Sequence, residues 1–148
     1  MLLVAAAAMT LVYRLVNRLP DAGLPDNLQV LEIFEEGGCL SCHSADPEVP
    51  FYAKMPVAGK IVMKDIDSGY RAFDIEPFMD ALAVDGEVSP VDLAKIEKVV
   101  LDDRMPMPKY YLVHWGSSLT DAKRAVVLSW IRDKRISMYD DGLSGDRA

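Results

Sequence analysis

Cysteine and histidine are scarce in this sequence, and their scarcity narrows the chemistry that the chain can support. The 148 residues include two cysteines, Cys39 and Cys42, and two histidines, His43 and His114. A closed structural zinc site needs four ligands, so the chain has few side chains to spare for one. Any argument about redox or metal chemistry therefore rests on residues 39–43.

Signals for β-structure are also missing. No run of alternating β-branched residues is bounded by turns, and Asp85-Gly86 lies between helical patterns rather than between two strands. Internal repeats and low-complexity stretches are absent. A chain of this length, with 51% hydrophobic and 26% charged residues, has the composition of one globular domain. We expect a single all-α domain.

No apolar run is long enough for a comfortable membrane span of roughly 20 residues. Residues 1–16 are apolar apart from Thr10, Tyr13 and Arg14. The charged start of a signal peptide is missing, which favours an uncleaved anchor over a cleaved signal. We therefore interpret residues 1–17 as a membrane anchor or signal segment, and residues 18–26, with two prolines and one glycine, as a tether.

Basic residues are fewer than acidic ones, with 16 Lys and Arg against 23 Asp and Glu, so the formal net charge is −7. Such a surface does not attract nucleic acid or anionic lipid headgroups. A protein partner that is basic or neutral at the contact fits better.

The helical patterns divide the rest of the chain. Asn27 is expected to cap a helix that ends at Gly37-Gly38, and residues 57–67 and 77–84 form shorter helices. Ser89 and Thr120 are expected to cap the two strongest helices, of which the second runs to about Arg135. The predicted domain covers residues 27–136, and residues 137–148 form a mobile tail. The apolar faces comprise Leu28, Leu31, Ile33 and Phe34; Leu93, Ile96, Val99 and Val100; and Ala122, Val126, Val127, Trp130 and Ile131.

The segment Cys39-Leu40-Ser41-Cys42-His43 follows the first of these helices directly. Cys-x-x-Cys-His is a specific signature of covalent attachment of one c-type haem, in which two thiols bind the porphyrin and the histidine binds the iron. A zinc site would lack ligands, and a thioredoxin-like pair should follow a strand and begin a helix. The predicted cofactor is therefore one covalent haem c, with His43 as proximal ligand.

The sixth iron ligand has several candidates. Met105 and Met107 lie in the loop Met105-Pro106-Met107-Pro108, where the prolines make the backbone rigid enough to direct a thioether, and His114 is a further candidate. A methionine that only packs the core is the plain alternative. For the neighbourhood of the haem, we expect Pro50 or Pro56 to offer a carbonyl to the second ring nitrogen of His43. Tyr110 and Trp115 are candidates to line the pocket, whereas burial between helices is the commoner explanation for Trp130.

A longer series of residues surrounds these candidates along the chain: Cys39 to Ser44, Pro50 to Ala53, Asp65, Gly69, Arg71, Arg104 to Pro106, Tyr110, His114, Leu119 to Asp121 and Trp130. In this order they resemble the small haem-binding domain family of c-type cytochromes, found alone or joined to di-haem cytochrome c peroxidase modules. The resemblance spans residues 31–131 and implies that Met105 is the sixth ligand, although the family's Met-Pro-Pro is Met105-Pro106-Met107 here.

These observations predict a cytochrome c-like helical domain that carries electrons and is not an enzyme. We expect it on the periplasmic side of the bacterial inner membrane, exchanging single electrons with a redox protein or a membrane-bound electron-transfer complex. The alternative is a haem sensor or peroxidase-like enzyme with an open or weakly held sixth site.

Overall fold

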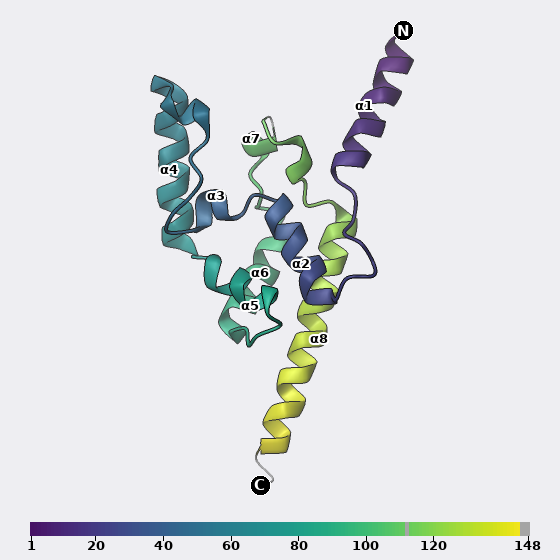
Figure 1. Ribbon diagram of the computed structural model, residues 1–148, viewed down its shortest axis with the longest axis vertical. Coiled ribbons are helices and arrows are strands. Elements are labelled where there is room, and N and C mark those ends of the chain that lie inside the picture. The colour runs from purple at the N-terminus through teal and green to yellow at the C-terminus, as the bar shows by residue number, and fades with distance from the viewer. Residues whose placement is uncertain (112, 146–148) are drawn as a thin grey trace.

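The computed structural model describes the backbone of residues 1–111 and 113–145 and side chains up to residue 140. This part of the chain contains eight α-helices, two 3-10 turns and no strand, which confirms the all-α prediction (Figure 1). The elements are α1 (Leu2–Val16), α2 (Asp26–Glu36), α3 (Leu40–His43), η1 (Phe51–Lys54), α4 (Pro56–Ala72), α5 (Glu76–Ala83), α6 (Pro90–Leu101), α7 (Pro108–Tyr111), η2 (Trp115–Ser117) and α8 (Asp121–Gly145).

The core lies between α2, α5, α6 and α8. The apolar faces predicted for these helices are largely confirmed, since Ile33, Leu93 and Val127 are all fully buried. The placement of Ala122 on the apolar face of α8 is wrong: Ala122 is exposed, and the neighbouring Lys123 is buried through its ion pair with Glu36. Aromatic rings tie the layers together: Phe78 packs edge-on against Trp130 at 5.9 Å between ring centroids, and Phe34 lies 6.0 Å from Phe78. Burying each large apolar side chain contributes about 1.5–3 kcal/mol to folding.

Two of the three predicted helix caps are present. The Val91 amide donates to Ser89 Oγ at 3.2 Å, and the Lys123 amide donates to Thr120 Oγ1 at 3.3 Å. The predicted cap at Asn27 is wrong, because α2 already begins at Asp26. Asn27 instead donates from Nδ2 to the Leu82 carbonyl at 2.7 Å, a bond between α2 and the end of α5 that outweighs its local preference.

Two predicted helix ends are also wrong. Helix α4 extends beyond the predicted end at residue 67 to Ala72, and Gly69 is a packing position inside it. Helix α8 continues past Arg135 to Gly145, so residues 137–145 are helical; residues 146–148 lie outside the described chain. The mobility of the tail stays a prediction.

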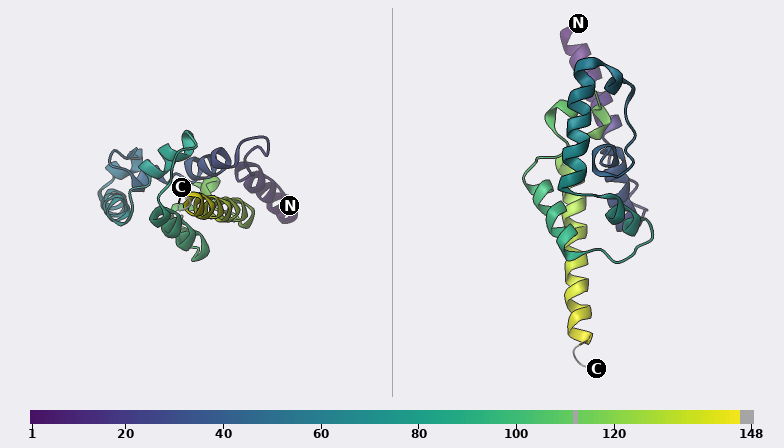
Figure 2. Two further views of the ribbon diagram at one scale, coloured as in Figure 1. Left: turned by 90° about the horizontal axis from the view of Figure 1, so that it is seen from below. Right: turned by 90° about the vertical axis from the view of Figure 1, so that its left-hand side faces the viewer.

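Helix α4 flanks one side of the core, while α8 runs along the long axis of the molecule (Figures 1 and 2). Helix α1 projects from the end opposite to the C-terminal part of α8. Residues 18–25, between α1 and α2, contain no helix. Within the described residues, no helix has both the length and the hydropathy required to cross a membrane.

Candidate cofactor site

The Cys-x-x-Cys-His segment forms a single helical turn, α3, directly after α2 ends. The predicted stop at the two glycines is confirmed, with the Gly38 amide bonded to the Glu35 carbonyl at 2.9 Å and Gly38 at φ +67°. A left-handed backbone is easily adopted by glycine alone. Gly38 therefore turns the chain so that Cys39 can begin α3.

Two neighbours press closely on this turn. A Cβ atom on Gly69 of α4 would lie 2.4 Å from the Cys42 carbonyl oxygen, so α4 packs on α3 through bare backbone. A Cβ atom on Gly38 would lie 2.3 Å from the Tyr110 hydroxyl oxygen, and this hydroxyl also bonds to Ser41. The motif is thus held between α4 and α7.

The ring of His43 is oriented by a backbone carbonyl, as predicted, but not by that of a proline. His43 Nδ1 lies 2.8 Å from the Phe73 carbonyl oxygen, so Nδ1 carries the proton and Nε2 keeps its lone pair for a metal. The prediction of Pro50 or Pro56 is wrong because residues 73–75 run alongside His43, whose own carbonyl accepts the Ile75 amide at 2.9 Å.

Both cysteines are free thiols in environments that disfavour the thiolate. The Cys39 side chain packs against the hydrophobic core, and burial raises the pKa of its thiol to about 12. Burial and, to a lesser extent, the Asp65 carboxylate raise the pKa of Cys42. No group of three or more metal-binding side chains occurs in the described part of the chain.

Beside the motif lies a cleft of about 840 Å³, a volume typical of small-molecule and cofactor sites. One wall comes from residues 48–52 and α4, and the other from α7 and η2. Its lining is largely apolar and aromatic, and comprises Glu36, Gly38, Ser41, Cys42, Glu48, Val49, Pro50, Tyr52, Ala58, Ile61, Val62, Asp65, Met107, Lys109, Tyr110, Val113, His114 and Ser117.

Aromatic rings stack at one side of the cleft. The Tyr110 and His114 rings are parallel within 11° at 3.9 Å, and His114 Nδ1 lies 3.2 Å from the Tyr110 carbonyl oxygen. Tyr52 approaches His114 from the opposite wall at 6.3 Å between centroids. Burial raises the pKa of Tyr110, so its hydroxyl keeps its proton at neutral pH. Flat aromatic walls of this kind suit a planar ligand.

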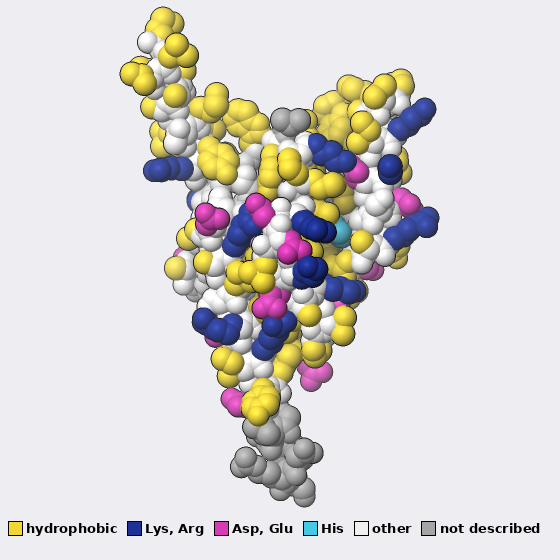
Figure 3. Space-filling view, turned by 180° about the vertical axis from the view of Figure 1, so that it is seen from behind, with side chains coloured by type: hydrophobic (Ala, Val, Ile, Leu, Met, Phe, Trp, Pro, Cys, Tyr) yellow, Lys and Arg dark blue, Asp and Glu magenta, His cyan; other side chains and the backbone are white. Residues whose placement is uncertain are grey.

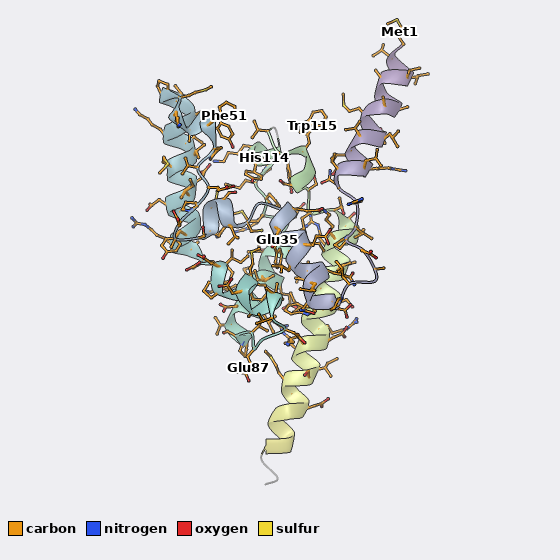
Figure 4. The ribbon with its side chains drawn as sticks, in the orientation of Figure 1. Met1, Glu35, Phe51, Glu87, His114 and Trp115 are labelled. Carbon is orange, nitrogen blue, oxygen red and sulfur yellow. The ribbon has the colours of Figure 1, made fainter. Side chains whose placement is uncertain are left out.

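The sixth-ligand candidates are placed differently. Met107 and His114 line the cleft, whereas Met105 is half-buried and is not among the lining residues (Figure 4 labels His114). Of the aromatic residues expected at the pocket, Tyr110 lines it. Trp130 belongs to the core, and Trp115 is exposed.

An ion pair that sequence reasoning missed joins the two walls. Lys109 Nζ of α7 lies 2.6 Å from Asp65 Oδ2 of α4, and both residues line the cleft. The partners are 44 residues apart, and each has an ordinary surface pattern in the sequence. No local signal indicates that they meet, although Asp65 belongs to the motifs that carry the family resemblance.

The donor set fits a c-type haem: two thiols on one turn, an imidazole with one free nitrogen, an apolar cleft at Cys42 and thioethers in the facing loop. An all-α domain with this site belongs to the class of haem-binding domains. The sequence profile of the haem-binding domain family matches residues 16–133, and the chain belongs to that family.

The cytochrome c peroxidase Ccp of Escherichia coli (strain K12) is similar to this chain, with 36% identity over 118 residues. The matched region is 80% of this chain and 25% of the peroxidase, so the chain spans about a quarter of that relative's length. No solved structure gives a significant match.

Proposed function

We propose that the chain is a mono-haem c-type cytochrome that carries single electrons and performs no bond-making chemistry. The main support is the Cys-x-x-Cys-His turn beside the apolar cleft, where the Phe73 carbonyl holds His43 Nδ1 and leaves Nε2 for iron. A bound haem would supply one-electron chemistry at its iron. The relative that matches is a cytochrome c peroxidase, which is a haem protein by name.

The protein's own residues would hold the cofactor and control its surroundings. Cys39 and Cys42 would attach it covalently, and the bond to the Phe73 carbonyl would make His43 a stronger and better oriented ligand. The aliphatic side chains of α4, such as Ile61 and Val62, would exclude water from one wall. A dry pocket and a thioether ligand both favour the reduced iron.

For the sixth ligand we propose Met105, with Met107 as the competing candidate. The family resemblance supports Met105, while the position of Met107 at the cleft supports the alternative. Both methionines lie in the loop that precedes α7, and the Lys109–Asp65 pair ties α7 to α4. A loop held in this way can keep a thioether on the iron.

We further propose that the domain works on the periplasmic side of the bacterial inner membrane, attached through α1. Its partner would be a redox protein that is basic or neutral at the contact, or a membrane-bound electron-transfer complex. The net charge of −7 supports such a partner, since opposite charges speed encounter.

The visible absorption spectrum of the matured protein tests the electron-carrier proposal. We expect low-spin bands, the weak red-edge band of iron–methionine bonding, and no carbon monoxide binding by the reduced form. Met105→Ala should abolish the red-edge band and Met107→Ala should keep it; the opposite pair of results would transfer the ligand role to Met107. Absence of covalent haem would refute the proposal.

A sensor or peroxidase-like haem is the second candidate. It is favoured by the stacked Tyr110 and His114 rings at the cleft, which bring an ionisable base to the site. High-spin bands, ready carbon monoxide binding and peroxide turnover that is lost in His114→Ala would support this candidate over the electron carrier.

A further inference from the structure

Three segments that are far apart in the sequence bring exposed apolar side chains to one end of the molecule. They are α1, the stretch from Phe51 to Val57 at η1 and the start of α4, and Trp115 of η2; we call this the apolar end (Figure 4). We propose that the apolar end docks on the surface of a phospholipid bilayer that contains anionic lipids. This rests on the attachment through α1 proposed above, and adds two contacts that orient the domain.

Large apolar side chains are exposed to solvent at each of these places. The exposed fraction is 76% for Phe51, 75% for Val57 and 52% for Trp115, and no residue of α1 is buried. Figure 3 shows hydrophobic side chains over α1 and over the prong formed by η1 and the start of α4. The continuous run of exposed apolar residues along α1 marks an interaction site, and Phe51, Val57 and Trp115 add to it at the same end of the molecule.

Helix α1 does not hang freely from the domain. The buried Asn17 side chain donates to the Trp115 carbonyl at 2.8 Å and accepts the Ser118 amide at 2.9 Å. The Val16 carbonyl also lies 3.4 Å from the Cβ position of Gly116. Because α1 and η2 are clamped together, insertion of α1 would bring Trp115 to the same surface.

The charge at this end is opposite to that of the whole chain. The three segments of the apolar end, which are α1, residues 51–57 and Trp115, contain no Asp or Glu and carry two basic side chains, Arg14 and Lys54. The expectation from net charge, that anionic headgroups are not attracted, therefore does not hold for this end. Basic residues beside tryptophan and aliphatic side chains are typical of membrane-surface contacts.

A bilayer fits this end better than a protein groove. The apolar groups lie on separate elements that project from the domain. Helix α1 has no buried residue, and among the described elements it packs mainly against η2. A fluid surface accommodates separate projections at once. The cleft is lined by Tyr52 and His114, close in sequence to Phe51 and Trp115, so docking would present the cofactor site to a redox partner at the bilayer surface.

Vesicle flotation of the matured full-length protein tests the proposal. The vesicles contain phosphatidylethanolamine with phosphatidylglycerol, or phosphatidylcholine alone. We expect preferential binding to the anionic vesicles that weakens with salt. The double variant Phe51→Glu, Val57→Glu and the single variant Trp115→Glu should each weaken partition by about tenfold or more, because burial of these apolar groups is lost.

Val84→Glu and Leu101→Glu are the matched controls, since both residues are as exposed as the tested ones but lie outside the apolar end. They should float like the unmodified protein, and thermal unfolding should show that all variants remain folded. If the unmodified protein floats and the tested variants bind equally well, α1 alone attaches the domain and the proposed orientation is wrong. If the unmodified protein does not float, membrane attachment itself fails; the haem spectrum tests the electron-carrier proposal independently.

Discussion

At the scale of single residues, two backbone features prepare the site. The Phe73 carbonyl selects the tautomer of His43. Gly38 has a left-handed backbone, and the Tyr110 hydroxyl occupies the space that a side chain at residue 38 would need. Both features belong to the backbone, so a motif defined by side chains does not reveal them. The site therefore depends on the backbone at Gly38 and Phe73 as well as on the side chains of the motif.

We predict that Gly38→Ala destabilises the folded chain by about 1–3 kcal/mol, from the strain of a left-handed alanine and the displacement of Tyr110. Denaturant unfolding measures the change. Gly86→Ala is the control, because a Cβ atom there would meet nothing closer than 3.3 Å. Equal losses in the two variants would show that Gly38 has no special role.

At the scale of elements, ion pairs fix how helices meet around the cleft. The Lys109–Asp65 pair links α7 to α4, and the Lys123–Glu36 pair links α8 to the end of α2 just before the motif. These pairs differ in their surroundings. Lys109 is half exposed, whereas Lys123 is only 1% exposed.

Lys109→Gln should change global stability by less than about 1 kcal/mol, because exposed pairs contribute little. In the haem-loaded protein, however, loss of this tie should loosen the loop that carries Met105 and Met107. The expected result is that the reduced variant binds carbon monoxide, whereas the reduced unmodified protein does not. Lys98→Gln, which breaks a pair between α6 and its C-cap residue Asp102, serves as control. Identical carbon monoxide binding in both variants would argue against a tie across the cleft.

Replacing either partner of the buried Lys123–Glu36 pair should lower the free energy of unfolding by a different amount. Glu36→Gln leaves the Lys123 ammonium buried without its charge partner and should lower the free energy of unfolding by about 2–4 kcal/mol. Lys123→Met removes the buried charge, keeps the packing of the stem, and should cost less than about 1 kcal/mol. Urea unfolding of both variants provides the comparison. A larger loss for Lys123→Met would mean that the ion pair itself is strongly stabilising.

At the scale of the whole molecule, the hydrogen bonds of Asn17 to residues 115 and 118 fix the orientation of α1 relative to the domain. Asn17→Ala removes three hydrogen bonds, including those to the Trp115 carbonyl and the Ser118 amide. The Trp115 carbonyl and the Ser118 amide then lose their partner, at a cost of about 1–3 kcal/mol for each buried group. The segment around Asn17 should detach more often from η2, and we expect faster tryptic cleavage after Arg18. Asn27→Ala, which breaks a bond between α2 and α5, should leave this cleavage rate unchanged. Unchanged cleavage in Asn17→Ala would show that α1 is held by other contacts.

Periodicity and caps predicted the helices well where the signal was local. Ser89 and Thr120 begin helices as expected, and Ile33 and Trp130 are buried as expected. Predictions were wrong where a distant contact decided the outcome. Gly69 lies inside a helix because it packs on Cys42, and Asn27 bonds to Leu82 instead of capping α2.

The sequence by itself determined the all-α class and the candidate haem motif, because helical periods and covalent attachment both depend on residues that are close in the chain. Tertiary structure alone decided which carbonyl orients His43, which helices wall the cleft, and that α1, Phe51 and Trp115 share one end. Those contacts join segments tens of residues apart. They follow from how the helices pack, and local patterns do not encode that arrangement.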